Sequence, residues 1–377
     1  MRIQRIEAFG LRGGTPKGGW TDELSGDDCV HTLVRVLSDD GRSGWGSAFT
    51  SERMVRASLC ELKPLYHQET CLEPARVTEK LHQHTFWMGM GGALTHTISA
   101  IDIALWDLFG KIVEQPVGRL LGGRFRDRVR PYASLLMDDP GRLADRLHEA
   151  RERGFTAFKI GWGPFGRVNR ETDEAIVRAA RDAVGPDALL MVDAGGSDPF
   201  WPHGLKWALD RASLLRAYDV HWFEEPLDQD ALEDFVRLRS AAPISIAGGE
   251  TLTRRQSFQT WITRAALDIV QPDVTKCGGL SECRRIAWLA EAFGVRYIPH
   301  GWNTALGLAA DLQLASALPR TDLVEYISGS PYVDELVSEP WSLDQEGFLP
   351  IPERPGLGIT LHPEALERYV RRSRNDP

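Results

Sequence analysis

The pattern of hydrophobic and polar residues divides the chain into two regions. In the first, the apolar runs 3–9 and 30–37 are typical of strands, and Asp40-Gly41 forms a turn into a third strand that ends near Trp45. The segment 94–111 has instead the spacing of an amphipathic helix. Residues 1–125 are therefore predicted to form an α+β domain.

In the second region, short apolar runs alternate with amphipathic helices. The runs are 129–136, 155–160, 189–192, 221–223, 244–247, 267–270, 295–298 and 322–324. One intervening helix places Ile176, Ala180 and Val184 on a single face before Gly185-Pro186 ends it. Eight strand–helix units predict a (β/α)₈ barrel over residues 126–342. The Pro-rich and then charged segment 343–377 is expected to pack back on the first domain.

A charged or titratable residue lies at or near the end of seven consecutive predicted strands. Successive members are separated by 34, 31, 26, 23, 27 and 25 residues, which is about one strand–helix unit each. Active sites of such barrels lie where the strands end, so these side chains are predicted to surround one site. They are Lys159, Asp193, Glu224, Glu250, Asp273, His300 and Glu325.

Asp193, Glu224 and Glu250 come from three adjacent strands and suggest a metal site. Three carboxylates that converge repel one another unless a cation lies between them. A set of oxygen ligands suits Mg²⁺, which keeps positions open for water or substrate. The alternative is that one or two of them only cap helices. Glu225 is expected to point away from Glu224 in an extended strand.

The other four residues suggest acid–base chemistry on a carboxylate. Asp273 beside His300 would fix the imidazole tautomer and raise its basicity. Lys159 could neutralise a substrate carboxylate, and Glu325 could hydrogen-bond a substrate oxygen. The alternatives are a structural histidine, and for Lys159 a salt bridge to a neighbouring strand.

Composition and charge exclude several other classes of protein. A formal net charge of −9 and the lack of a basic stripe argue against nucleic-acid binding. No apolar run approaches the roughly 18–20 residues that cross a membrane. The five scattered cysteines are expected to be free thiols in a reducing compartment, which favours a cytoplasmic location.

Short motifs along nearly the whole chain resemble the mandelate racemase/muconate lactonizing enzyme family of the enolase superfamily. They are the stretch 99–108 (SAIDIALWDL) with Gly110-Lys111 and Leu120-Leu121-Gly122-Gly123, then Val192-Asp193, Trp222-Phe223-Glu224-Glu225-Pro226, Gly248-Gly249-Glu250, Gln271-Pro272-Asp273, Lys276-Cys277-Gly278-Gly279 and Pro299-His300-Gly301.

This resemblance implies a capping domain, completed by the C-terminal tail, over the mouth of the barrel. It implies one Mg²⁺ per chain on the three carboxylates, an Asp273–His300 dyad, and Glu325 as hydrogen-bond donor to the enediolate oxygen. Capping loops at about 13–20 and 48–54 would shape specificity. The resemblance also suggests a homo-oligomer.

Two departures from the family pattern narrow the reaction. Lys159-Ile160-Gly161 has glycine where the family often has a second lysine as base on the opposite face. Asp193-Ala194-Gly195 has glycine where many members have a polar group. With one good base, His300, elimination of water from an acid sugar to give a 2-keto-3-deoxy acid is the first expectation.

Two other functions remain open at this point. A racemase, epimerase or cycloisomerase of a carboxylic acid would need Lys159 or a capping-loop residue as its second base. A carboxylate-binding protein without turnover would not need the intact dyad. The sequence does not select the acid.

Overall fold

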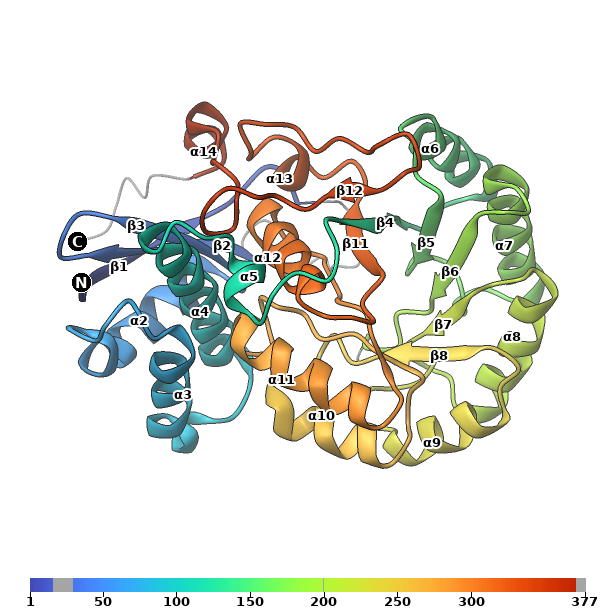
Figure 1. Cartoon of the computed structure of the whole chain (residues 1–377). Helices are drawn as coiled ribbons and strands as arrows, with labels where there is room; N and C mark the ends of the chain where they lie inside the picture. The colour runs from blue at the N-terminus through green and yellow to red at the C-terminus, as the bar shows by residue number, and fades with distance from the viewer. Residues whose placement is uncertain (16–29, 199, 371–377) are drawn as a thin grey trace.

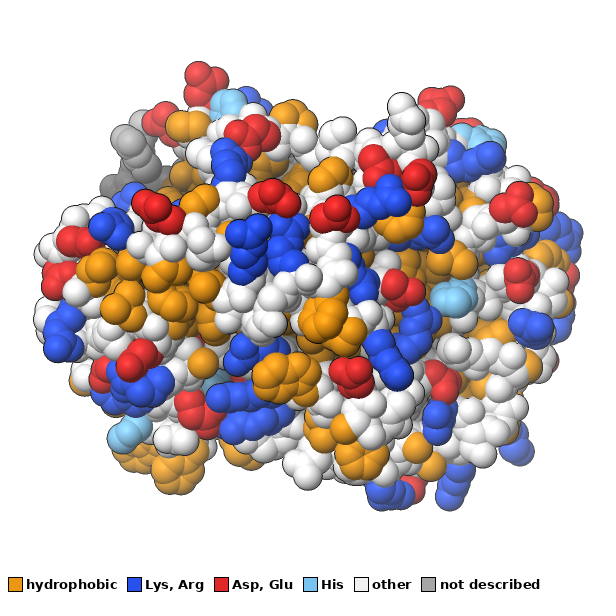
Figure 2. Space-filling model, in the orientation of Figure 1, with side chains coloured by type: hydrophobic (Ala, Val, Ile, Leu, Met, Phe, Trp, Pro, Cys, Tyr) orange, Lys and Arg blue, Asp and Glu red, His pale blue; other side chains and the backbone are white. Residues whose placement is uncertain are grey.

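The computed structural model describes residues 1–15, 30–198 and 200–370, and it contains two lobes that pack side by side (Figure 1). Part of the expected capping loop 13–20 lies outside the described residues. Within the described residues, no helix is long and apolar enough to cross a membrane. On the face shown in Figure 2, basic and acidic side chains are interspersed.

The first lobe is an antiparallel sheet in the order β1-β2-β3, with helices on one side of it. Its elements are β1 (Ile3–Gly10), β2 (His31–Ser38), β3 (Ser43–Phe49), α2 (Glu52–Tyr66), α3 (Pro74–His84), the 3₁₀ turn η1 (Phe86–Met88), α4 (Gly92–Ile112) and α5 (Val117–Leu120). Helix α4 packs directly on β3, because a Cβ atom on Gly46 would lie only 2.1 Å from the Ala100 carbonyl oxygen. Glycine is therefore required for this close contact.

The second lobe is a curled parallel sheet surrounded by helices (Figure 1). Its strands are β4 (Arg128–Leu136), β5 (Ala157–Gly161), β6 (Leu189–Asp193), β7 (Trp222–Glu224), β8 (Ser245–Gly248), β9 (Ile269–Val270), β10 (Arg296–Tyr297) and β11 (Leu323–Ile327). Its helices are α6 (Pro140–Glu152), α7 (Arg170–Val184), α8 (Leu205–Ala217), α9 (Leu232–Ala241), α10 (Arg254–Thr263), α11 (Gly279–Ala292) and α12 (Ala305–Ser316). The predicted (β/α)₈-type barrel with an α+β cap is confirmed.

The barrel closes without a backbone ladder at one position. The strand order runs β10-β9-β8-β7-β6-β5-β4-β11, so β10 and β11 lie at its two ends. Single hydrogen bonds span this seam: Thr321 Oγ1 donates to the Tyr297 carbonyl at 3.2 Å, and Gly301 N donates to Glu325 Oε2 at 2.7 Å. Side chains therefore replace the ladder at the seam.

Three strand predictions were wrong in their extent. The runs 267–270 and 295–298 form only the two-residue strands β9 and β10. Strand β11 continues to Ile327, so Glu325 lies inside a strand and not after its end. The side chains of Ile269, Val270 and Tyr297 in these two short strands are buried.

Each barrel strand, or for β10 the residue just after it, contributes one hydrophobic side chain to the interior of the barrel. These residues form a separate buried cluster of Tyr132, Ala157, Met191, Trp222, Ala247, Ile269, Ile298 and Leu323. Side chains alternate along a strand, so a residue two positions later again faces inward, nearer the carboxyl end. Five of the seven candidate residues lie two positions after a member of this cluster: Lys159, Asp193, Glu224, His300 and Glu325.

The C-terminal segment contacts both lobes. It follows the short helix α13 (Pro331–Asp334) and contains β12 (Leu349–Pro350) and α14 (Pro363–Tyr369), and β12 pairs with β4 in antiparallel fashion. Leu357 N donates to Asp107 Oδ1 at 2.9 Å, and Arg12 N donates to the Tyr369 carbonyl at 2.9 Å. The tail therefore connects the barrel to α4 and to the end of β1.

Candidate active site

A cavity of about 250 Å³ lies at the carboxyl ends of the barrel strands. Its lining comprises Phe49, Ser134, Leu135, Leu136, Lys159, Gly161, Trp162, Asp193, Ser197, Glu250, Thr251, Lys276, His300, Trp302 and Glu325. The first lobe contributes Phe49, from the end of β3 and the capping loop 48–54. The cavity therefore includes five of the seven candidates, and Glu224 and Asp273 contact them from the layer behind.

The three candidate metal ligands converge. Each of Asp193, Glu224 and Glu250 offers an oxygen within 4.8 Å of the other two. Burial and the nearby Glu224 carboxylate raise the pKa of Asp193 well above its usual range. Such crowding of buried carboxylates is relieved when a cation binds between them. The donor set is all oxygen, so this group fits a hard divalent metal ion.

Glu224 is held by three donors. Trp222 Nε1 lies 2.9 Å and Gln271 Nε2 lies 2.7 Å from Oε2, while Lys159 Nζ lies 2.6 Å from Oε1. These contacts fix the direction of the carboxylate before any ligand binds. Sequence reasoning missed Trp222 and Gln271. A usable signal existed, because Trp222 lies two positions before Glu224 in β7, and Gln271 lies two positions before Asp273 in the segment just after β9.

Asp273 and His300 lie side by side at the ends of β9 and β10, where a parallel bridge joins their backbones. His300 Nδ1 is 2.7 Å from Asp273 Oδ2, and its Nε2 is 3.0 Å from Glu250 Oε2. Asp273 Oδ1 also accepts from Thr275 N at 2.7 Å and from Thr275 Oγ1 at 2.6 Å. Asp273 thus orients the imidazole so that Nε2 points toward the carboxylate cluster.

The charges around this pair shift both titrations. Burial would raise the pKa of Asp273, but hydrogen bonding to His300 and the charge of Lys276 outweigh it and lower this pKa. Burial opposes the charged imidazolium, yet the Glu250 carboxylate outweighs it and raises the pKa of His300 well above its usual range. A cation bound by Glu250 would weaken that effect and lower the pKa of His300. The imidazole would then be neutral and able to accept a proton.

Lys159 connects the metal-ligand cluster to Glu325. Its Nζ atom is 3.0 Å from Glu325 Oε1 and 4.0 Å from Asp193 Oδ2. Burial would raise the pKa of Glu325, but the Lys159 ammonium outweighs it and lowers this pKa. The salt bridge considered as the alternative for Lys159 is thus present, and Lys159 also lines the cavity.

Lys276 is a further cation in the cavity whose importance the sequence left open. Its Nζ atom is 3.6 Å from Glu250 Oε1 and 4.2 Å from the centroid of the Phe49 ring. The lysine therefore contacts both the carboxylate cluster and the first lobe. Trp302 was missed as a lining residue because it follows His300 in a loop, where no strand periodicity applies.

One local conformation corrects an expectation from the sequence, and another shows why a glycine is present. Glu225 is not extended: its φ is +41°, and its Oε1 accepts from Gly249 N at 3.3 Å. Burial and Glu250 raise the pKa of Glu225 to about 7. Gly195, with φ +67°, is required by packing, because a Cβ atom there would lie 2.8 Å from the Trp162 ring.

The chain matches two known protein families, each over a different part of its length. The "Enolase C-terminal domain-like" family matches residues 142–365, and the "Mandelate racemase / muconate lactonizing enzyme, N-terminal domain" family matches residues 27–122.

Curated relatives and solved structures match over almost the whole chain. D-galactarolactone cycloisomerase of Agrobacterium fabrum is 36% identical over 363 residues, which cover 91% of this chain and 92% of that protein. D-xylonate dehydratase of Haloferax volcanii is 33% identical over 393 residues, which cover 98% and 93%. The 3,6-anhydro-D-galactonate cycloisomerase structure from Zobellia galactanivorans has a TM-score of 0.88 at 28% identity, covering 99% of this chain and 100% of that one.

Proposed function

Because the chain belongs to the mandelate racemase/muconate lactonizing enzyme family of the enolase superfamily, we propose that it is an Mg²⁺-dependent enzyme that abstracts the proton alpha to a carboxylate. We propose further that the reaction is dehydration of an acid sugar to a 2-keto-3-deoxy acid. The observation that carries this proposal is the oriented Asp273–His300 pair, whose Nε2 faces three converged carboxylates.

Asp193, Glu224 and Glu250 would hold one Mg²⁺ per chain. When bound, the ion supplies Lewis-acid stabilisation of the negative charge that develops on the substrate carboxylate. Lys159 adds a fixed positive charge on the same side of the cavity. Glu325, paired with Lys159 and held in its charged form, would accept a hydrogen bond from a substrate hydroxyl, and not donate one as the resemblance implies.

His300 would move the protons. Its Nε2 takes the α-proton, and Asp273 stabilises the imidazolium that results. The imidazolium then protonates the β-hydroxyl as it leaves as water, and the resulting enol tautomerises to the keto acid. One histidine serves both steps, so no second base on the opposite face is needed.

Isomerisation of a sugar acid or its lactone is the second candidate. The relative from Agrobacterium fabrum, a D-galactarolactone cycloisomerase, is the observation in its favour. An isomerase would keep the hydroxyl group and leave the mass of the product unchanged. Lys159 or a residue of the capping loops would then have to supply further proton transfer.

The test is a screen of stereoisomeric aldonic and aldaric acids and their lactones with Mg²⁺ present. A dehydratase gives a 2-keto product that reacts with semicarbazide and is lighter than the substrate by one water. In D₂O this product carries deuterium at C3, and unreacted substrate keeps its C2 configuration. A product of unchanged mass, with an inverted centre or a rearranged ring, would reject dehydration in favour of isomerisation.

A further inference from the structure

Residues 273–279 form a turn that places Asp273 and Lys276 at the candidate site and ends at the start of α11. Lys276 N and Cys277 N both donate to the Asp273 carbonyl, at 3.0 and 2.9 Å. The side chains of Asp273 and Lys276 therefore depend on where this one turn, residues 273–279, is placed. Its far end is the first turn of α11.

Helix α11 cannot cap its own N-terminus. Its N-cap residue is Gly278, which has no side chain to accept hydrogen bonds from the free N–H groups of the first turn. The acceptors come from α4 in the other lobe. Ser99 Oγ accepts from Gly278 N at 2.8 Å, and Asp102 Oδ2 accepts from Ser281 N at 2.9 Å.

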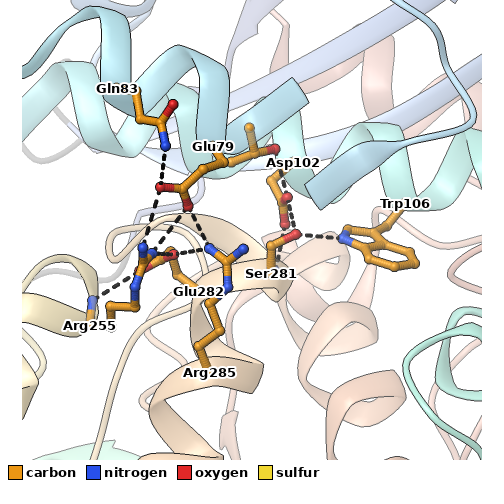
Figure 3. Close-up of polar contacts among 9 residues, drawn as sticks. Glu79, Gln83, Asp102, Trp106, Arg255, Ser281, Glu282 and Arg285 are labelled. Carbon is orange, nitrogen blue, oxygen red and sulfur yellow. Dashed lines mark hydrogen bonds and ion pairs between the residues drawn. The ribbon is translucent and has the colours of Figure 1, made fainter. Parts of the chain in front are cut away.

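Asp102 is the centre of this contact between the lobes (Figure 3). Its Oδ1 also accepts from Ser281 Oγ at 2.6 Å and from Thr78 Oγ1 at 2.7 Å. Trp106 Nε1 donates to Ser281 Oγ at 2.9 Å, so the serine hydroxyl is free to point its proton at Asp102. The carboxylate is fully buried, and these bonds are worth more there than at the surface.

The approach of α4 to this turn is too close for any other residue at position 279. Gly279 has φ +81°, and a Cβ atom on it would lie 2.5 Å from both Cβ and Oδ2 of Asp102. The carboxylate thus packs directly against the backbone that leads back to Lys276. A second cap contact holds the same turn, where Phe49 N donates to the Thr275 carbonyl at 3.5 Å.

An outer set of ion pairs joins the same lobes through side chains, and both of its arginines also pair with Glu282 in the first turn of α11. Glu79 of α3 pairs with Arg285 of α11 at 2.7 Å and with Arg255 of α10 at 3.2 Å (Figure 3). These side chains are partly exposed, so this cluster holds the interface together but is screened by solvent. It supplies a matched control within one interface.

We propose that Asp102 is a positioning residue for the reaction: from the capping lobe it caps α11 and thereby holds the 273–279 turn, which places Asp273 against His300 and Lys276 against Glu250. The inference rests on the proposed function, since it assigns a purpose to the placement of the dyad. Under this proposal, the capping lobe sets the geometry of the Asp273–His300 pair.

The experiment compares Asp102→Ala, Asp102→Asn and Glu79→Gln in the full chain. Asp102→Ala should lower kcat at least tenfold and change KM less than threefold, because Lys159 on β5 and Glu325 on β11 lie outside the 273–279 turn. Asn should restore much of kcat, since its carbonyl oxygen can accept from Ser281 N while its amide donates to the two hydroxyls. Glu79→Gln should leave kcat within about twofold.

Hydrogen exchange supplies a readout that does not need turnover. Asp102→Ala should speed amide exchange in peptides covering residues 273–281 at least tenfold, and Glu79→Gln should not. Equal effects of the two variants on kcat and on exchange in this peptide would overturn the proposal, as would an Asp102→Ala enzyme with wild-type kcat.

Two further comparisons keep the test decisive. If Asp102→Ala fails to fold by circular dichroism, Ser99→Ala removes the acceptor for Gly278 N together with one hydrogen bond to the Thr95 carbonyl within α4, and it should show the same localised exchange and a smaller fall in kcat. Wild-type protein that converts no acid sugar or lactone contradicts the proposed function alone. The exchange comparison then decides whether Asp102 holds the turn.

Discussion

Gly161 and Asp193 face each other across β5 and β6 so closely that a Cβ atom on Gly161 would lie 2.9 Å from Asp193 Cβ and 3.1 Å from its Oδ2. Real Cβ atoms essentially never come so near another heavy atom. At the position where the resemblance led us to expect a second lysine, the side chain of a proposed metal ligand takes up the space.

This contact predicts that restoring a side chain at position 161 harms the enzyme. Gly161→Ala should lower kcat/KM at least tenfold and weaken Mg²⁺ binding, because Asp193 must move, and Gly161→Lys should be worse. Gly141→Ala is the control, since its Cβ would meet nothing nearer than Asp139 Oδ1 at 3.4 Å. A lysine variant that gains racemisation would show that the site tolerates a second base.

Removal of the metal should abolish turnover. After exhaustive EDTA treatment, activity should fall to background and return with Mg²⁺. Calorimetry should show about one Mg²⁺ per chain for the wild type, and Asp193→Asn or Glu250→Gln should weaken binding at least tenfold. Glu225→Gln is the matched control, because Glu225 is buried nearby but lies outside the converged set. Unchanged affinity in Asp193→Asn would place the ion elsewhere.

His300 is expected to be the principal acid and base. His300→Asn should lower kcat by several orders of magnitude, because the amide cannot accept the α-proton. Exchange of the substrate α-proton with D₂O should stop as well. His203→Asn is the control, since the His203 ring stacks on Trp207 at 4.4 Å and does not line the cavity. A His300→Asn enzyme within tenfold of wild type would refute the assignment.

The buried Asp102 should give the protein an unusual dependence of stability on pH. Burial raises its pKa to about 6 from 3.8, so between these values the folded state binds a proton that the unfolded state has released. The contribution of Asp102 to the free energy of unfolding therefore falls as pH rises from about 4 to 6, by about 3 kcal/mol at most, and is constant above.

Denaturant unfolding of the wild type and Asp102→Asn from pH 4 to pH 7.5 measures this contribution. The difference in unfolding free energy, wild type minus variant, should decrease across that window, since the other carboxyl groups cancel. A difference that is flat or that increases with pH would show that Asp102 is stabilised in its charged form.

The sequence alone was sufficient to predict the barrel and most of the candidate site. Strand periodicity is local, so a charged residue two positions after an inward-facing hydrophobic residue, as Asp193 follows Met191, points into the barrel mouth in any barrel with these strands. The spacing of the seven residues, about one strand–helix unit each, then places them around one ring. Both signals depend only on neighbours along the chain.

What remained was decided by contacts between segments far apart in the sequence. Phe49 reaches the cavity from the cap, and Asp102 caps a helix 179 residues away. No local pattern marks such partners, because they depend on how the two lobes dock and how side chains fill the space between them. At Gly161, the sequence revealed that a second base is missing. Only the packing against Asp193 shows why a larger side chain does not fit there.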